Sequence, residues 1–182
     1  RENAMSEIKD LFKTPLYAEY LKVNNDSIKK YITDFKKKNA SVLKSNIGGW
    51  QSDNLEGKHL PLNDLFIDIE KHGNIFANKI GLKDNLTINN IWININYYKD
   101  YNINHRHSHC VLSGVFYVKT PKDCGNIQFQ SGDDDMRNYD WDENTIKERN
   151  VYTVPQYWMP ALKNMLYIFP SWLSHNVLPN LN

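Results

Sequence analysis

Four of the six histidines in this chain fall into a pattern that metal sites use. Three of them alternate with other residues in the string His-Arg-His-Ser-His at 105–109, and a fourth, His175, comes much later. Side chains two residues apart in a strand project from the same face, so His105, His107 and His109 are expected side by side. Imidazoles grouped in this way bind iron, zinc, copper or nickel. We therefore predict a metal site from His105, His107 and His175, with His109 as a spare. The competing interpretation is a surface histidine cluster.

Other catalytic patterns do not occur in the sequence. It has no Gly-x-Ser-x-Gly nucleophile motif, no Walker loop and no Gly-x-Gly-x-x-Gly fingerprint. The two cysteines, Cys110 and Cys124, are too few for a disulfide framework, and we interpret them as reduced thiols. His59 and His72 are interpreted as a loop residue and a packing residue. The histidine pattern is therefore the strongest chemical signal in the chain.

The composition is that of one ordinary domain with a balanced surface. Of the 182 residues 41% are apolar, and 22 basic against 21 acidic residues leave a net charge of +1. This balance disfavours nucleic acid as a partner. No apolar run approaches the roughly 18 residues that a membrane helix needs, and no signal peptide is recognisable. We expect a cytoplasmic protein that does not contact the membrane.

The first part of the chain predicts a strand and two helices. Residues 11–21 are expected to form an entry strand, and the polar residues at 25–27 offer N-caps for a helix over 27–38. A loop over 45–53 carries two adjacent glycines and a tryptophan. A second helix is expected from 62 or 63 to 80, since apolar residues recur there near helical spacing.

The second part of the chain predicts short strands. They are expected at 91–96, 110–119, 126–130, 151–154, 165–169 and 175–178. Short strands without crossover helices favour an antiparallel barrel or sandwich. We predict one domain over 1–182, with a strand and helices over 1–85 and a β-rich metal-binding core over 86–182. The polar stretch 133–148, with its acidic triplet, is interpreted as a solvated loop or a lid.

Several strings in the sequence resemble one known family. They are Trp-Ile-Asn at 92–94, His-Arg-His at 105–107, Leu-Ser-Gly-Val-Phe-Tyr-Val at 112–118, Phe-Pro-Ser-Trp-Leu-Ser-His at 169–175 and Gly-Gly-Trp-Gln-Ser at 48–52. Over roughly 10–180, the chain resembles a family of 2-oxoglutarate/Fe(II)-dependent oxygenases, an uncharacterised phage and bacterial branch of the prolyl-hydroxylase-like superfamily. The resemblance implies an α+β, mainly β fold, a double-stranded β-helix (jelly roll) with N-terminal helices packed outside. It also implies the host cytoplasm as location if a phage encodes the protein.

The same resemblance implies the ligands of an Fe(II) ion. The superfamily motif is His-x-Asp or Glu followed far downstream by His, so His105 matches the first ligand and His175 the last. The carboxylate position is His107 in this chain, as the His-x-His string of the branch has it. Three neutral imidazoles leave the full charge of Fe(II) in place, whereas a carboxylate would cancel half of it. Such a site should favour anionic co-ligands.

The resemblance further implies 2-oxoglutarate as cosubstrate and a dioxygenase (hydroxylase) activity. Tyr117 matches a tyrosine that binds the distal carboxylate of 2-oxoglutarate. The usual basic partner lies about nine to eleven residues past the last histidine, which from His175 means 184 to 186, beyond Asn182. Asn94 and Asn96 alternate with apolar residues and are expected to face the interior beside the metal, as candidate cofactor-binding residues.

The substrate and partners are open at this stage. We expect a small molecule or a protein side chain, with Trp50, Trp141 and Trp158 as candidate substrate-facing aromatics, and a homodimer is allowed. Two alternatives stand beside the oxygenase. One is a cupin-like jelly-roll metalloprotein, although residues 111–115 lack the Glu that cupins add after His-x-His. The other is a metal-free structural or interaction module.

Overall fold

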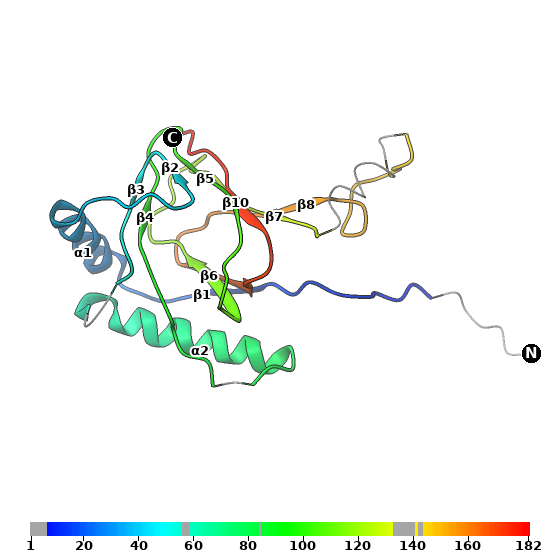
Figure 1. The fold of residues 1–182 in the computed structure, drawn as a ribbon, viewed down its shortest axis with the longest axis horizontal. Coiled ribbons are helices and arrows are strands. Elements are labelled where there is room, and N and C mark those ends of the chain that lie inside the picture. The colour runs from blue at the N-terminus through cyan, green and yellow to red at the C-terminus, as the bar shows by residue number, and fades with distance from the viewer. Residues whose placement is uncertain (1–6, 56–58, 84, 133–140, 142–143) are drawn as a thin grey trace, which may run out of the picture.

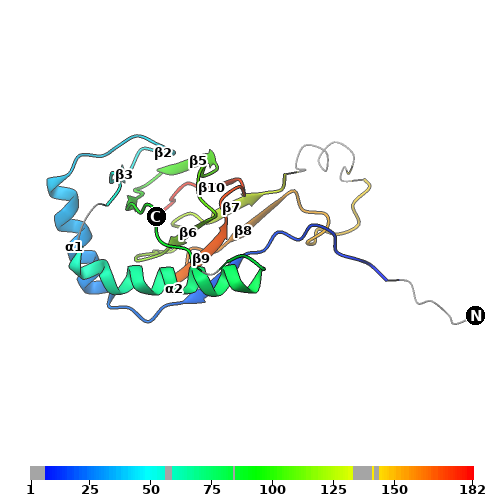
Figure 2. The same cartoon turned by 60° about the horizontal axis from the view of Figure 1, so that its bottom comes forward.

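The computed structural model describes residues 7–55, 59–83, 85–132, 141 and 144–182. Within these segments the fold is mainly β with two helices, as the sequence predicts. The helices are α1 (Asn25–Lys38) and α2 (Asn63–Lys79), the latter preceded by a short 3-10 helix, Leu60–Leu62. In Figures 1 and 2 both helices lie outside the strands. Neither of them, in the described segments, has the length and apolarity that crossing a membrane requires.

All strand pairs are antiparallel, and the strands form three sheets. The smallest, a two-stranded ribbon, pairs β3 (Trp50–Gln51) with β4 (Asn94–Ile95). A three-stranded sheet has the order β1 (Tyr17–Tyr20), β9 (Met165–Pro170) and β6 (Leu112–Phe116). A five-stranded sheet has the order β2 (Asn46–Ile47), β5 (Tyr101–His105), β10 (His175–Val177), β7 (Ile127–Gln130) and β8 (Gln156–Met159). Strands from the first 85 residues thus join every sheet.

Helix α1 has a polar N-cap and a basic last turn, and both features stabilise helix ends. The N-cap of the helix is Asn24, one residue before the polar run 25–27 that was expected to supply the cap. The Asn24 side chain accepts hydrogen bonds from the backbone N–H groups of Asp26 and Ser27. Three lysines fill its last turn, where cations interact favourably with the helix dipole. Its apolar face packs into a core shared with α2 and the three-stranded sheet.

Strand β9 separates two hydrophobic cores because its side chains alternate between two faces. Leu166 and Ile168 join the core under the helices. Tyr167 and Phe169 join a second core with Phe129 and other residues of the five-stranded sheet. This second core lies between the two larger sheets and, as described below, touches the histidines.

One predicted strand is wrong. Residues 151–154 form a turn, and the strand follows at β8 instead. Asn150 holds the turn: its side chain accepts the N–H of Tyr152, and its carbonyl accepts those of Thr153 and Val154. These backbone N–H groups are therefore engaged within the turn and not in a sheet ladder. The lid predicted over 133–148 lies largely outside the described residues.

Candidate metal centre

Two histidines that are close in the sequence and a third from far downstream meet at one point. One potential ligand atom each from His105, His107 and His175 lies within 4.8 Å of the others. Their ring centroids are 4.3 Å (105 to 175), 4.9 Å (105 to 107) and 5.0 Å (107 to 175) apart. His175 is buried, and the other two are half-buried. The arrangement can hold one metal ion through three nitrogen donors.

His105 and His175 are oriented by the same local device. His105 ends β5, His175 begins β10, and the two are direct partners in the register of these strands. The Nδ1 of His105 donates to the carbonyl of Ile103 at 2.8 Å, and the Nδ1 of His175 donates to that of Leu173 at 2.9 Å. A carbonyl only accepts, so each Nδ1 carries a proton. In the neutral form of either ring, Nε2 is then the nitrogen with the lone pair that can bind a metal.

His107 reaches the site from a loop and not from a strand. Strand β5 ends at His105, so the expectation that alternation along one strand aligns His105, His107 and His109 is wrong. The backbone N–H of His107 donates to the carbonyl of Ser171 at 3.2 Å, which ties this loop to the turn before β10. His109 is exposed, has a φ of +62°, and lies outside the cluster.

Burial keeps two of these imidazoles uncharged at neutral pH. It lowers the pKa of His175 from 6.5 to about 4, an effect to which His105 and His107 add as nearby like charges and which the bond to Leu173 opposes. Burial, with His105 beside it, also lowers the pKa of His107. A neutral imidazole is the form that binds a metal, so neither His107 nor His175 needs to lose a proton at pH 7 to act as a ligand.

An aromatic wall adjoins the cluster along the five-stranded sheet. Directly paired residues share a sheet face, which puts His105, His175, Phe129 and Tyr157 in one row. The rings of Phe129 and Phe169 lie 6.2 Å and 4.8 Å from that of His175. Tyr157, at the end of the row on β8, is 55% exposed. The row therefore runs from the metal-binding nitrogens to an open aromatic edge.

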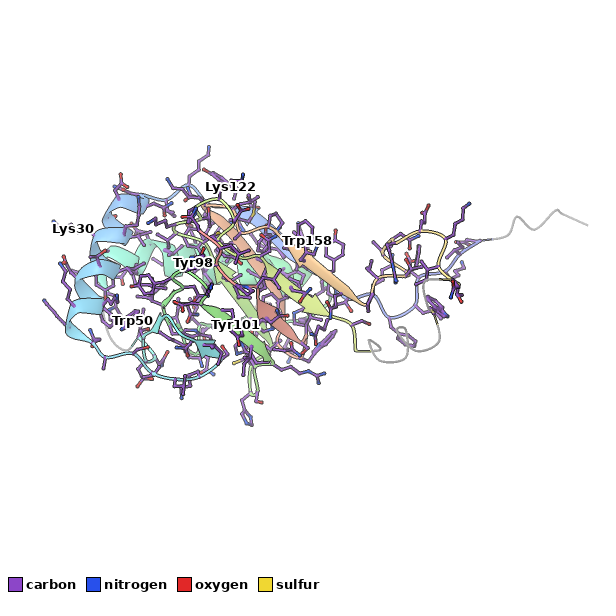
Figure 3. All side chains as sticks on the ribbon, turned by 90° about the horizontal axis from the view of Figure 1, so that it is seen from above. Lys30, Trp50, Tyr98, Tyr101, Lys122 and Trp158 are labelled. Atoms are coloured by element: carbon purple, nitrogen blue, oxygen red, sulfur yellow. The ribbon has the colours of Figure 1, made fainter. Side chains whose placement is uncertain are left out.

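The tryptophans expected to face the substrate lie elsewhere. Trp50 packs against Phe35 of α1, and its indole N–H donates to the carbonyl of Asn39. Trp158 pairs with Gln128 and is therefore on the opposite sheet face from His175. Figure 3 shows these two tryptophans at opposite sides of the molecule. Trp141 is exposed.

Trp92 is the tryptophan that touches the cluster. Its ring centroid lies 5.5 Å from that of His107. Sequence reasoning used Trp92 only as part of a family string. The alternation of Ile91, Trp92 and Ile93 was the available signal, because the isoleucines pack under the helices and the residue between them faces the other way.

Tyr117 carries a polar group that lacks a protein partner. Its hydroxyl is buried and, among the described residues, makes no hydrogen bond. Burial raises the pKa of this phenol well above its usual 10, with smaller contributions from Tyr167 and Cys124. Its side chain packs on the core that contains Phe129 and Phe169, the two phenylalanines in contact with His175. Buried hydroxyls are normally hydrogen-bonded, so this one stands out.

The two candidate asparagines differ in their surroundings. Asn94 is exposed on β4. Asn96 donates its amide N–H to the side chain of Asn102 at 3.1 Å, and Asn102 in turn donates to Ser45. Within the described residues no hydrogen bond joins either asparagine to the three histidines, and their cofactor-binding role stays a prediction.

Gln51 is a further polar residue that sequence reasoning missed. It is only 5% exposed, and its Oε1 has no hydrogen-bond partner within the described segments. It pairs directly with Asn94 across the β3–β4 ribbon, so the two side chains share a face. Its neighbour Trp50 points the other way, toward α1.

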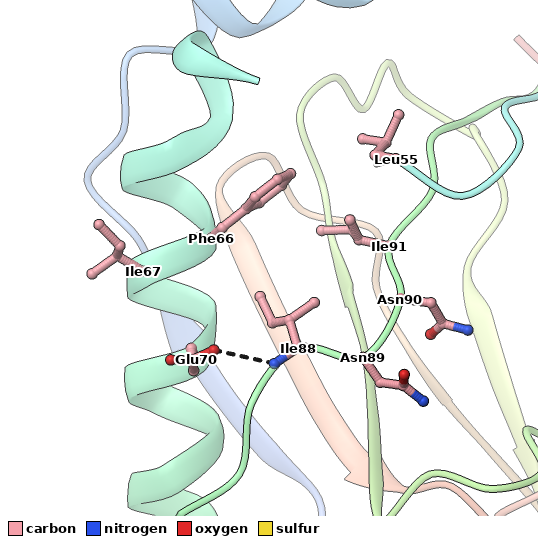
Figure 4. A pocket seen from close by; sticks show the side chains of 8 residues that line it. All are labelled: Leu55, Phe66, Ile67, Glu70, Ile88, Asn89, Asn90 and Ile91. Carbon is pink, nitrogen blue, oxygen red and sulfur yellow. Dashed lines mark hydrogen bonds between the residues drawn. The ribbon is translucent and has the colours of Figure 1, made fainter. Parts of the chain in front are cut away.

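A separate cavity of about 300 Å³ lies between α2 and the segment before β4. Figure 4 shows its lining, in which the Glu70 carboxylate accepts the backbone N–H of Ile88 at 3.1 Å. None of the three histidines lines this cavity. It is therefore separate from the histidine cluster.

Comparisons with known proteins agree with this geometry. Residues 90–182 match a family described as "Putative 2OG-Fe(II) oxygenase", a span that contains all three clustered histidines and Tyr117. Eleven chains of solved structures match the fold. One is a prolyl-4-hydroxylase from Pseudomonas putida, with a TM-score of 0.62 and 11% identity over 93% of this chain and 87% of that chain. A search of curated proteins gives no match.

Proposed function

The chain belongs to the 2OG-Fe(II) oxygenase family, and on that premise we propose that it is an Fe(II)/2-oxoglutarate-dependent dioxygenase that hydroxylates its substrate. The observation that carries the proposal is the meeting of three imidazoles, two of them oriented by hydrogen bonds from Nδ1 to a backbone carbonyl. This donor set comes from residues 105, 107 and 175, the same positions that the family strings predict.

The donor set fits Fe(II). Imidazole nitrogen is a ligand that Fe(II) accepts, and three ligands leave coordination positions open for a cosubstrate and dioxygen. We propose His105, His107 and His175 as the ligands. Since none of them is an anion, the ion would keep its full positive charge and attract the carboxylate of 2-oxoglutarate strongly.

The unpartnered hydroxyl of Tyr117 fits the cosubstrate. A buried phenol that meets no protein group can donate a hydrogen bond to a carboxylate, and charged acceptors make such bonds stronger. We propose that Tyr117 binds the distal carboxylate of 2-oxoglutarate, and that Asn94 and Asn96 offer further polar contacts.

When bound, iron and 2-oxoglutarate supply the oxidation: dioxygen converts 2-oxoglutarate to succinate and CO2, and its second oxygen atom enters a substrate C–H bond to give an alcohol. The protein's own residues would hold the metal ion and exclude water from it. His105 and His175 present their Nε2 atoms without reorganisation, because their Nδ1 bonds already fix the rings. Phe129 and Phe169 exclude water from one side of His175.

The remaining parts of the proposal concern fold, substrate and location. The antiparallel sheets and the likeness to the prolyl-4-hydroxylase fold support a double-stranded β-helix within a single domain. We propose a small molecule or a protein side chain as substrate; the neighbour's name refers to prolyl residues. A cytoplasmic location (that of the host for a phage protein) and a homodimer complete the proposal.

The test is anaerobic reconstitution of the full-length protein with Fe(II). We expect one bound iron, and a visible charge-transfer band that develops only when 2-oxoglutarate is added. With Zn(II) in place of Fe(II), no such band should form. Tight iron binding without the band would contradict the oxygenase and favour a cupin-like metalloprotein. Failure to bind iron at all would favour a metal-free module.

A further inference from the structure

We propose that Trp92 is the positioning residue for His107 in the metal centre. The inference rests on the proposed function and assigns a role to a side chain that the ligand set leaves out. It starts from a difference between His107 and the other two histidines.

His107 lacks the device that orients its partners. The Nδ1 atoms of His105 and His175 are each bonded to the carbonyl two residues earlier. No such ring hydrogen bond is present for His107 among the described residues, and the ring stands on a loop that bonds Ser171 through backbone groups, the N–H of His107 and the carbonyl of Val111. Something else must restrict the rotation of this ring if it is to hold a metal in a fixed geometry.

The ring of Trp92 is in place to do so. It lies 5.5 Å from the His107 ring at an interplanar angle of 54°. The other rings recorded against His107 are those of His105 and His175, the two remaining ligands. Trp92 is thus the one contacting ring, within the described part of the chain, that would not itself bind the metal.

Trp92 is itself held firmly by its neighbours. The N–H of Ile93 donates to the Ser52 hydroxyl, and its carbonyl accepts the N–H of Ser52, both at 2.9 Å. On the other side, the carbonyl of Ile91 accepts the N–H of Leu55 at 2.8 Å. Both isoleucines pack into the core under the helices. These contacts fix the backbone on either side, so the tryptophan ring between them is a rigid support for His107.

The experiment measures binding of Co(II) alone to full-length protein carrying Trp92→Leu or Trp92→Phe. We expect Trp92→Leu to weaken Co(II) binding about tenfold and to change the visible cobalt spectrum, as loss of a ligand-orienting group does. Trp92→Phe should retain most of the affinity, because a phenyl ring still contacts the imidazole. Trp158→Leu, on the opposite face of the sheet from His175, is the matched control and should bind as the unaltered protein does.

A double-mutant cycle with His107→Ala separates positioning from a general loss of structure. If Trp92 acts through His107, Trp92→Leu should cost no further affinity in the His107→Ala background. An equal loss in both backgrounds, or no loss in either, would overturn the inference. Fluorescence offers a readout independent of affinity: Co(II) should quench tryptophan emission in the unaltered protein, and much less in Trp92→Phe. If the unaltered protein binds no Co(II), the proposed centre itself fails, which is a different result from binding that ignores Trp92.

Discussion

His105 and His175 are direct partners across β5 and β10, and each donates its Nδ1–H to the carbonyl two residues before it. The same local geometry therefore occurs twice, on neighbouring strands, and turns two Nε2 atoms toward a common point. This half of the centre is organised by sheet register and backbone bonds. The third imidazole depends on a loop and on a neighbouring indole.

Removing the hydroxyl of Tyr117 should change folding stability and 2-oxoglutarate binding in opposite directions. Because this buried hydroxyl has no protein partner, Tyr117→Phe should raise the free energy of unfolding by about 1 kcal/mol. The same change should weaken 2-oxoglutarate binding about tenfold, since a bond to a carboxylate is lost. Denaturant unfolding and a titration of the charge-transfer band would measure the two effects.

Tyr167→Phe is the matched control for this prediction. The Tyr167 hydroxyl donates to the carbonyl of Pro160 at 2.8 Å, so its loss should destabilise the protein by about 1 kcal/mol. If both variants shifted stability in the same direction, the idea that Tyr117 is held ready for a ligand would be contradicted.

Gln51 offers a second case of a polar group without a partner. Gln51→Met keeps the length of the side chain and removes a buried unbonded oxygen, so it should stabilise the metal-free protein by about 1 kcal/mol. Gln128→Met is the control variant. Because Gln128 donates a hydrogen bond to Gln156 at 3.0 Å, its replacement should not stabilise the protein. Thermal unfolding of both variants would test this prediction. A lower unfolding midpoint for Gln51→Met than for the unaltered protein would contradict it.

The metal-free protein should lose stability as the pH falls from about 6.5 toward 4. In the folded state the pKa of His175 is about 4, against 6.5 ordinarily, so the unfolded chain binds the proton more readily. Folding stability therefore rises with pH across this window and is fully present above it. The shift corresponds to roughly 3 kcal/mol at most. Urea unfolding of chelator-treated protein at several pH values measures it, and His175→Asn should flatten the dependence.

His107→Asp tests the charge of the centre. An aspartate there would restore the carboxylate that the superfamily motif has, and would cancel half of the charge of Fe(II). We expect the variant to bind Fe(II) but to hold 2-oxoglutarate several-fold more weakly, because the ion attracts the anionic cosubstrate less. Tighter 2-oxoglutarate binding in this variant would contradict the electrostatic argument.

The helices and the residues of the histidine cluster were predictable from the sequence because their signals are short strings of residues. Apolar spacing gave α1 and α2 to within one or two residues, and the family strings singled out the residues that meet in the cluster. The path of His107 was not predictable, since alternation along a strand says nothing about where that strand stops. The turn at 151–154 was missed because Asn150 competes for the backbone groups that a strand would use.

Contacts between distant segments were also beyond the sequence. Nothing in a local pattern indicates that Trp92 meets His107, or that Tyr157 and not Trp158 shares a face with His175. The second fact depends on the pairing register of β7, β8 and β10, and an offset of one residue would reverse it.

The row of paired residues that starts at His105 and ends at Tyr157 links the histidine cluster to the edge strand β8. Strand β8 pairs only with β7 in the described part of the sheet, so its outer residues can change without moving either carbonyl-locked imidazole. Substitutions on this border strand should therefore leave the geometry of the three-histidine cluster unchanged.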